Sequence, residues 1–325
     1  ARPVAYLLGA TDAMIGECVG YARVVLLFNA AFMLQNVFQS FLVTAAKPKF
    51  GLIVTIAAGV TNMVLDALFI GVFRWGVIGA ALATGLSQLV GGLLPLIFFI
   101  NKNNGSNLCL VPSKLEFKPI LMACTNGVSE LMTNISSSIV GMLYNFQLMK
   151  FAGENGVAAY GVIMYVQFIF IAVFFGYAIG TAPIVGFNFG AQRHSELKNM
   201  LRKSMRIMIS SGVFMMALAQ LLASTLARIF VGYDPELMEM TKHAFSLVSF
   251  SFILAGVNIY ISSFFTALNN GVISAVVSFL RTLVFQASSV LILPVFFELD
   301  GIWAAITVAE LCAAAISISL LFANR

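Results

Sequence analysis

Long apolar runs recur along the whole of this 325-residue chain. A helix needs about 20 apolar residues to cross the roughly 30 Å hydrocarbon core of a bilayer. Because 60% of the residues are hydrophobic and only 10% are charged, the chain has too little polar surface to cover itself in water. The sequence therefore predicts an all-α, polytopic membrane protein. We expect nine spans, at approximately 20–45, 50–72, 77–100, 119–149, 156–187, 204–231, 241–267, 272–297 and 301–323.

The charged residues in the loops predict the orientation. Lysine and arginine gather in alternate loops, at 47–49, 101–118 and 191–206, whereas the loops between them are richer in acids. Basic loops stay in the cytoplasm, so this side is expected to face inward, in the cell (inner) membrane. The net charge of +5 is then an orientation signal. We expect membrane lipid and small organic compounds as partners, and no nucleic acid.

A polar stretch and an internal repeat indicate two lobes. Residues 101–118, a cytoplasmic linker, separate a lobe of three spans (1–100) from one of six (119–325). "NVFQSFLVTA" (36–45) and "NIYISSFFTA" (258–267) share Asn, Ser, Thr and Ala at the same offsets. Each is followed by a span and then by a similar helix opening. We expect a helical bundle of two pseudo-symmetric lobes, as in transporters built from parallel repeats. If the repeat is six helices long, the first lobe lacks about three.

An acid and an amide inside one span predict a cation site. Asp66 and Asn62 are four residues apart and therefore share a helix face. Counting about 1.5 Å per residue places Thr84 of the next span at a similar depth. Ionisable groups at membrane depth usually face a cavity or a partner. These oxygen ligands suit Na⁺, or a proton site with two hydrogen-bonding neighbours. The alternative is a structural hydrogen bond between neighbouring helices.

Three further charged residues lie away from the ends of the predicted spans. Glu130 is surrounded by polar residues and is expected to face a wet cavity, or to remain protonated and hydrogen-bonded. Arg281 and Glu310 lie on adjacent spans at similar depths, and we expect a structural ion pair between them. The residues expected to line a substrate cavity are Asn36, Asn126, Tyr144 and Met142.

Several stretches resemble the multidrug and toxic compound extrusion (MATE) family, and the resemblance covers essentially the whole chain. They are "LLGATDAM" (7–14), "NMVLDALFIGVFRWGVIGAALAT" (62–84), "GVAAYGVIMYVQFIFIAVFFGYAIGTAPIVGFNFGAQRHSELK" (156–198) and "SSFFTALNNG" (262–271). By this resemblance the nine spans would be helices four to twelve of a twelve-helix fold, and helices one to three would be missing except for the tail of the third.

The resemblance implies antiport, in which an organic compound leaves the cell as Na⁺ or H⁺ enters. It implies a first-lobe cation site at Asn62, Asp66 and Thr84, together with a first-helix aspartate that the given sequence does not contain. In the second lobe the pseudo-symmetric position is Leu148, so that lobe cannot duplicate the site. Glu130 resembles an acid that some members carry on the seventh helix.

Other function classes find less support in the sequence. A lipid-linked oligosaccharide flippase of the same superfamily is the main alternative, but it should carry a strongly cationic cavity, and Arg281 is the single base away from the ends of the expected spans. Nucleotide-binding and hydrolase motifs (GxxxxGK[ST], HExxH, GxSxG) do not occur. The two histidines stand alone and the four cysteines show no CxxC spacing. We expect neither enzymatic activity nor a cofactor other than the coupling ion, and we expect a monomer.

Overall fold

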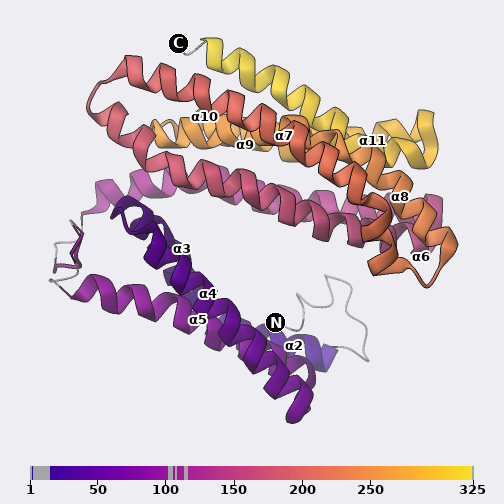
Figure 1. Ribbon diagram of the computed structural model, residues 1–325, viewed down its shortest axis with the longest axis horizontal. Helices are drawn as coiled ribbons and strands as arrows, with labels where there is room; N and C mark the ends of the chain where they lie inside the picture. Colours follow the sequence, from indigo (N-terminus) through magenta and orange to yellow (C-terminus); the bar gives the residue numbers. More distant parts are fainter. Residues whose placement is uncertain (1, 3–14, 102–104, 107, 113–115, 324–325) are drawn as a thin grey trace. The chain divides into compact units, whose positions relative to one another are not determined.

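The computed structural model describes residues 2, 15–101, 105–106, 108–112 and 116–323, and all regular secondary structure within them is helical. The chain divides into two compact units, residues 1–115 and 116–325. The first unit contains α2 (Ile15–Leu27), α3 (Asn29–Thr44), α4 (Pro48–Asp66), the π-helix η1 (Ala67–Val72) and α5 (Gly76–Ile100) (Figure 1).

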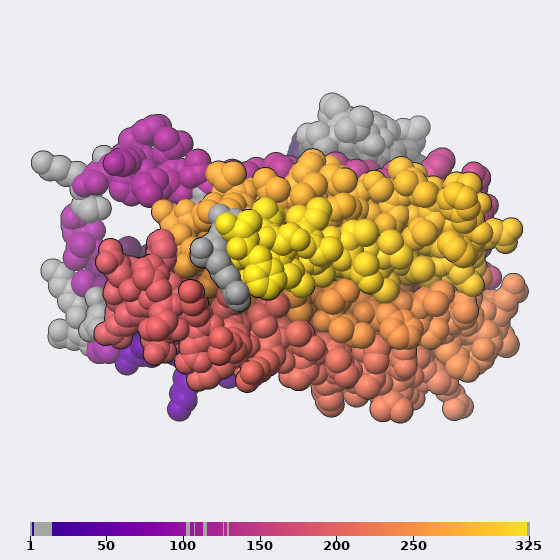
Figure 2. Space-filling view, turned by 90° about the horizontal axis from the view of Figure 1, so that it is seen from above, coloured from indigo at the N-terminus to yellow at the C-terminus, as the bar shows by residue number. Residues whose placement is uncertain are grey.

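The second unit is the larger one. Its elements are α6 (Phe117–Gly190), α7 (His194–Val231), α8 (Pro235–Ser249), α9 (Ser251–Ala267), α10 (Gly271–Phe279), the π-helix η2 (Leu280–Phe285) and α11 (Gln286–Ala323). In the space-filling view the yellow C-terminal part of α11 lies on the surface of this unit, beside its orange helices (Figure 2). Large buried side chains such as Tyr144, Phe245 and Trp303 fill its core.

Helices cover all nine of the expected ranges in the part of the chain that the structure describes. Five helical stretches are long and apolar enough to cross a membrane, and two bent helix pairs add one span each. Two of the five stretches contain a break that divides each of them into two helices. α6 breaks at Gly153 (φ 61°, ψ −149°) and α11 breaks at Glu298 (φ 48°, ψ −128°). The chain is thus an integral, multi-pass membrane protein.

The backbone repeats between the two units. α2 and α3 meet at Phe28 with a bend of 48°, and α8 and α9 meet at Phe250 with a bend of 47°. Phe28 and Phe250 correspond to each other in the same register that aligns "NVFQSFLVTA" with "NIYISSFFTA". The turn after each bent span also contains a left-handed residue, Ala46 or Asn269. The bent spans therefore belong to one structural repeat that occurs in both units.

Two π-helices interrupt the spans that follow the bent pairs. η1 begins directly after Asp66, and η2 contains Arg281. A π-helix closes its hydrogen bonds one residue later than an α-helix, and such segments occur frequently at functional sites. Thus η1 directly follows a charged residue within a span, and η2 includes one.

Glycines allow α3 and α5 to pack closely in the first unit. A Cβ atom on Gly85 would collide with the ring of Phe28, and one on Gly91 would collide with the Gln35 side chain. At Gly92 it would come within 3.0 Å of the Ala31 carbonyl oxygen. Small residues of this kind bring helix backbones close together in membranes. α4 also packs against α5, and its Asn62 and Asp66 side chains are half-buried.

Candidate functional site

Asp66 and Asn62 lie at the end of α4, one helical turn apart. Asp66 is the last α-helical residue, and the π-helix η1 starts at Ala67. Both side chains are half-buried. The four-residue spacing places them on one helix face, as the sequence indicates. Because the π-helix widens the turn that follows, Asp66 stands where the regular helix ends.

Both side chains contain a buried atom that lacks a partner. Among the residues that the structure describes, the Asp66 Oδ1 and Asn62 Nδ2 atoms are shielded from solvent and make no hydrogen bond, not even to each other. A buried polar atom without a partner costs free energy, and an ionised carboxylate costs more than an amide. Buried polar groups in native proteins nearly always have a partner. These two atoms make the pair a candidate cation site.

Thr84 is not joined to this pair by a hydrogen bond in the described residues. It lies on α5, the helix that packs against α4, and its side chain is half-buried. Its backbone carbonyl accepts a hydrogen bond from the Ser87 hydroxyl at 2.7 Å. Its participation in a cation site stays a prediction.

The chemistry of the pair fits either predicted coupling ion. A carboxylate oxygen and an amide carbonyl oxygen are ligands that hard cations prefer. Rotating the Asn62 amide by half a turn would replace Nδ2 by Oδ1 and give a sodium ion a second oxygen. In the orientation found, Nδ2 can instead donate a hydrogen bond to a water molecule beside a protonated or ionised Asp66.

Glu130 lies on the first half of α6 and is exposed. Its backbone carbonyl accepts a hydrogen bond from the Asn134 side chain at 2.8 Å. The structure describes no ion pair of its carboxylate. The side chain of Asn126 lies outside the described side chains. The role of Glu130 in a second-lobe cavity stays a prediction.

The other expected cavity residues have different environments. Asn36 on α3 is exposed and donates a hydrogen bond to the Phe32 carbonyl oxygen at 2.9 Å. Met142 is exposed, at 57% of its surface. Tyr144 is buried in the core, where its ring stacks on Tyr160 at 5.0 Å. A substrate would reach Tyr144 only after the surrounding helices rearranged.

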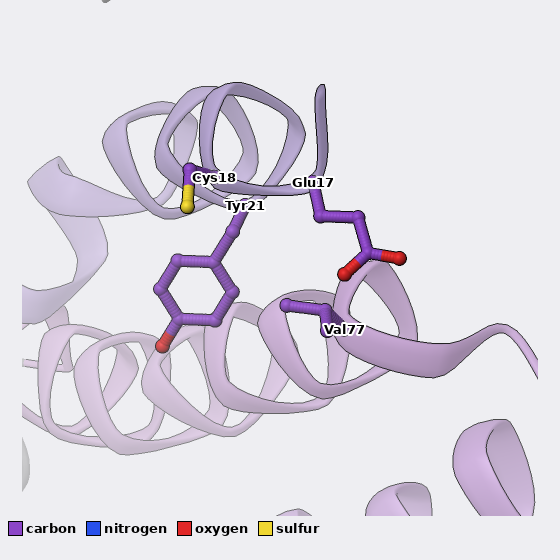
Figure 3. A pocket seen from close by; sticks show the side chains of 4 residues that line it. All are labelled: Glu17, Cys18, Tyr21 and Val77. Atoms are coloured by element: carbon purple, nitrogen blue, oxygen red, sulfur yellow. The ribbon is translucent and has the colours of Figure 1, made fainter. Parts of the chain in front are cut away.

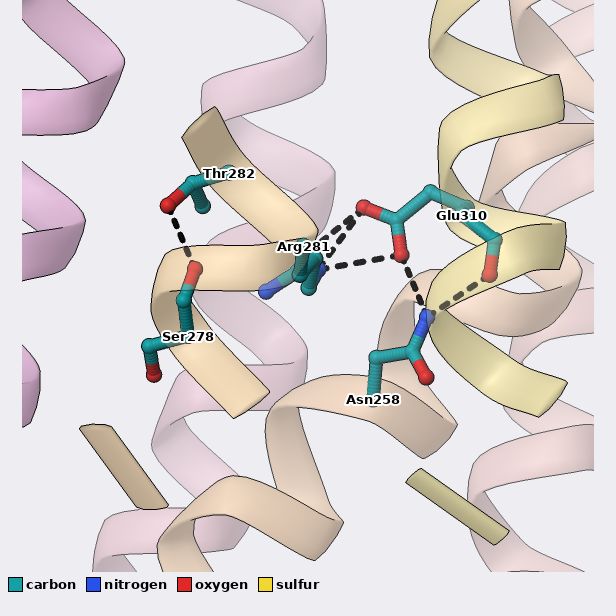
Figure 4. Close-up of polar contacts among 5 residues, drawn as sticks. All are labelled: Asn258, Ser278, Arg281, Thr282 and Glu310. Atoms are coloured by element: carbon teal, nitrogen blue, oxygen red, sulfur yellow. Dashed lines mark hydrogen bonds and ion pairs between the residues drawn. The ribbon is translucent and has the colours of Figure 1, made fainter. Parts of the chain in front are cut away.

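Arg281 and Glu310 form a buried ion pair in the second unit (Figure 4). The Arg281 Nε atom donates to both carboxylate oxygens, at 2.9 and 3.0 Å, and Nη2 donates to Oε1 at 2.7 Å. Asn258 on α9 adds a hydrogen bond to Oε2 at 2.7 Å and another to the Glu310 backbone carbonyl at 3.0 Å. The three residues connect α9, η2 and α11.

Asn258 is the member of this network whose role the sequence alone did not reveal. Its side chain is fully buried. The available signal was the repeat, because Asn258 aligns with Asn36 as the first residue of the two matching stretches. Leu148, which the sequence comparison of the lobes singled out, is buried in the core of the second unit.

Comparison with known proteins gives a consistent result. A family model described as MatE matches residues 1–68 and 131–292. The Multidrug export protein MepA of Staphylococcus saprophyticus is 24% identical over 323 residues, which cover 96% of this chain and 68% of that protein. The protein of the same name from Staphylococcus aureus is 23% identical over an equal length.

Solved structures are similar in fold. A MATE protein in complex with MaL6 has a TM-score of 0.90 at 22% identity, covering 96% of this chain and 70% of that one. An outward-facing multidrug resistance MATE family transporter of the MOP superfamily has a TM-score of 0.89 at 23% identity, with the same coverage. A MOP superfamily transporter from Pyrococcus furiosus, whose binding pocket is described as having reverse polarity, has a TM-score of 0.89 at 22% identity, covering 98% of this chain and 72% of that one.

Proposed function

Because the chain belongs to the MatE family, we propose that it is a secondary active multidrug exporter of the cell membrane, which moves organic compounds outward as H⁺ or Na⁺ enters. The observation that carries this proposal is the buried Asp66 Oδ1 atom without a partner, one turn from an equally unpartnered Asn62 Nδ2. The relatives named as multidrug export proteins support the type of substrate.

Asp66 is the residue that binds the coupling ion. An ionised carboxylate without a partner is unstable at membrane depth, and a proton or a sodium ion neutralises it. A ligand shifts a conformational equilibrium only if it binds one state more tightly than the other. The cation-bound and cation-free forms of the first unit therefore differ in stability. This difference couples ion entry to substrate release.

The substrates are cationic or amphipathic organic compounds. The charged side chains that lie away from the ends of the expected spans are Asp66, Glu130, Glu310 and Arg281, and Arg281 is neutralised by its contact with Glu310. Asp66 and Glu130 have no ion-pair partner in the described part of the chain. The excess of unpaired negative charge favours positively charged substrates.

The test is gradient-driven efflux of ethidium from liposomes that contain the full-length native protein. Asp66→Asn keeps the shape of the side chain and removes its charge, so we expect gradient-driven efflux to be lost while the protein stays folded. Glu154→Gln, which changes an exposed acid, is the matched control and should leave efflux unchanged. Separate pH and sodium gradients identify the ion. Efflux by Asp66→Asn with the gradient dependence of the wild type would refute the proposal.

The flippase alternative predicts a different electrostatic pattern. A pyrophosphate-linked lipid requires several cations within the cavity, because two phosphates must be neutralised. Arg281, the base away from the ends of the expected spans, already donates three hydrogen-bond contacts to Glu310. This observation makes export of organic compounds the better supported function.

A further inference from the structure

A pocket of about 350 Å³ opens between α2 and α5 in the first unit. Glu17, Cys18 and Tyr21 line it from α2, and Val77, the second residue of α5, lines it from the other side. Figure 3 shows the Tyr21 ring and the Glu17 carboxylate both extending from α2 toward α5. None of these residues belongs to the proposed cation site.

The side chains in this pocket have a defined chemistry. Glu17 and Tyr21 are four residues apart and therefore share one face of α2. Glu17 is exposed and has no ion-pair partner in the part of the chain that the structure describes. The remaining lining is almost entirely apolar, with a half-buried thiol at Cys18 and an aliphatic side chain at Val77. One carboxylate thus faces an otherwise apolar, aromatic-lined pocket.

The repeat shows that Glu17 differs from the aligned acid of the second unit, which has an ion-pair partner. In the register that aligns Phe28 with Phe250, Glu17 aligns with Glu239. Glu239 is paired with Lys242, whose Nζ atom lies 3.7 Å from its Oε1 atom. The residue that aligns with Lys242 is Gly20. The first unit therefore keeps the acid and lacks the base.

The two units also differ at the position of the aromatic ring in the pocket. Tyr21 aligns with His243 of the second unit, which contacts the Asp300 carboxylate at 2.7 Å. In the register that aligns Gly76 with Gly301, the residue of the first unit that corresponds to Asp300 is Trp75. The ion-paired surface of the second unit is thus replaced in the first by an unpaired acid and aromatic residues.

This face lies at the periphery of a complete six-helix unit. In the second unit, which contains six spans, the aligned side chains of Glu239 and His243 are 67% and 55% exposed. Their exposure follows from their place on α8, whose buried residues lie on another face of the helix. The equivalent face of α2 therefore remains accessible when a unit has all its helices.

We propose that the pocket between α2 and α5 is a binding site for organic monocations that carry an apolar or aromatic body. Glu17 neutralises the positive charge, the Tyr21 ring contributes a cation–π contact, and Val77 packs against the apolar part. The volume falls within the range of small-molecule pockets. The Glu17 carboxylate disfavours organic anions, because like charges repel. In the orientation proposed from the basic loops, the site lies on the outer face of the membrane.

The role of this site as a station on the export path depends on the proposed function, whereas the binding itself does not. The experiment therefore measures binding without any ion gradient. Cys18 is the reporter, because its thiol lies within the pocket. The other cysteines, Cys109, Cys124 and Cys312, are replaced by serine or alanine. A membrane-impermeant maleimide is added from outside to cells that contain the full-length protein, and the rate of Cys18 labelling is measured.

Two probes of the same shape and opposite charge test the chemistry. We expect tetraphenylphosphonium to slow the labelling of Cys18 and tetraphenylborate to leave it unchanged. Glu17→Gln should weaken the protection by up to about fivefold, the effect of one exposed ion pair. Tyr21→Leu should weaken it by a similar factor, and Tyr21→Phe should preserve it, because the ring is retained. Glu239→Gln, at the aligned position of the second unit, should have no effect.

Three results would overturn the proposal. Equal protection by both ions would show that charge is not recognised. Protection of Glu17→Gln at wild-type concentrations of the cation would remove the carboxylate from the site. A Cys18 thiol that reacts only after denaturation would show that another part of the protein covers the pocket. If the wild-type protein shows no gradient-driven efflux but tetraphenylphosphonium still protects Cys18 from labelling, the export function is refuted and the binding site stands. If efflux is normal but Cys18 is not protected, the binding site is refuted and the export function stands.

Discussion

Arg281 contacts both carboxylate oxygens of Glu310, and it does so from a π-helix rather than from an α-helix. The Glu310 side chain is 3% exposed and the Arg281 side chain is 12% exposed. The aligned region of the first unit has no comparable pair among its described residues. In the register that aligns Gly76 with Gly301, Glu310 corresponds to Gly85, next to which the Phe28 ring lies. At this position of the repeat, the second unit is therefore stabilised internally by an ion pair, and the first unit by close packing of a glycine against an aromatic ring.

Breaking the ion pair on one side should strongly destabilise the second unit. Glu310→Gln leaves the buried Arg281 charge without its partner, and we expect a loss of about 3–5 kcal/mol in the free energy of unfolding. The double variant Arg281→Met, Glu310→Met removes both charges and should lose considerably less. Thermal unfolding of the detergent-solubilised protein measures the difference. A double variant less stable than Glu310→Gln would show that the pair is more than mutual neutralisation.

Gly85→Ala should destabilise the first unit because the added methyl group collides with the Phe28 ring. Overpacking of this kind typically costs about 1–3 kcal/mol. Gly59→Ala is the matched control, since nothing lies within 4 Å of a Cβ atom at Gly59 and alanine favours a helix over glycine. We expect thermal unfolding at a lower temperature for the first variant and at an equal or higher temperature for the second. Equal unfolding temperatures for the two variants would contradict the observed packing.

The spans and the repeat could be predicted from the sequence because both depend on local patterns. Span length follows from the hydrocarbon thickness, and matching letters such as Asn36 and Asn258 reveal the repeat. The bends at Phe28 and Phe250 and the two π-helices could not be predicted. They contain no proline, and they lie within apolar stretches whose sequence predicts an uninterrupted helix. Such features depend on how neighbouring helices pack, which composition does not specify.

The candidate site was predictable in part for the same reason. The face shared by Asn62 and Asp66 follows from helical periodicity, and the structure preserves it. The missing hydrogen bonds of the two side chains are a property of the tertiary structure. Glu17 reads in the sequence only as an acid near a loop. Its relation to Tyr21 becomes meaningful once the aligned Glu239 is seen to have its own base.

Substitutions of Asn62 should distinguish sodium from proton coupling. Asn62→Asp adds a second carboxylate one turn from Asp66, and two close carboxylates favour a bound cation or a shared proton. Asn62→Leu removes the amide oxygen that a sodium ion would need but leaves Asp66 able to bind a proton. We expect Asn62→Leu to abolish sodium-driven efflux if sodium is the coupling ion. It should retain proton-driven efflux if the proton is.

The comparison requires efflux measured under a pH gradient alone and under a sodium gradient alone. Asn134→Leu, which changes an asparagine of the second unit that donates to a backbone carbonyl, is the control for a general loss of amide hydrogen bonds. Wild-type efflux by Asn62→Leu under both gradients would remove Asn62 from the site.

At the breaks within α6 and α11, replacing the native glycine should lower stability, and introducing a glycine should raise it. Gly153 and Glu298 both have positive φ with strongly negative ψ, a conformation that glycine adopts readily and other residues adopt at a cost of about 1–3 kcal/mol. Nothing lies within 4 Å of a Cβ atom at Gly153, so Gly153→Ala should destabilise through the backbone alone. Glu298→Gly should relieve strain and raise the unfolding temperature. The gain is reduced because glycine has a greater conformational entropy in the unfolded chain. Glu298→Ala separates the backbone from the side chain, because alanine keeps the strain and removes the carboxylate. If Glu298→Gly and Glu298→Ala unfold at the same temperature, the strain at this break does not limit stability.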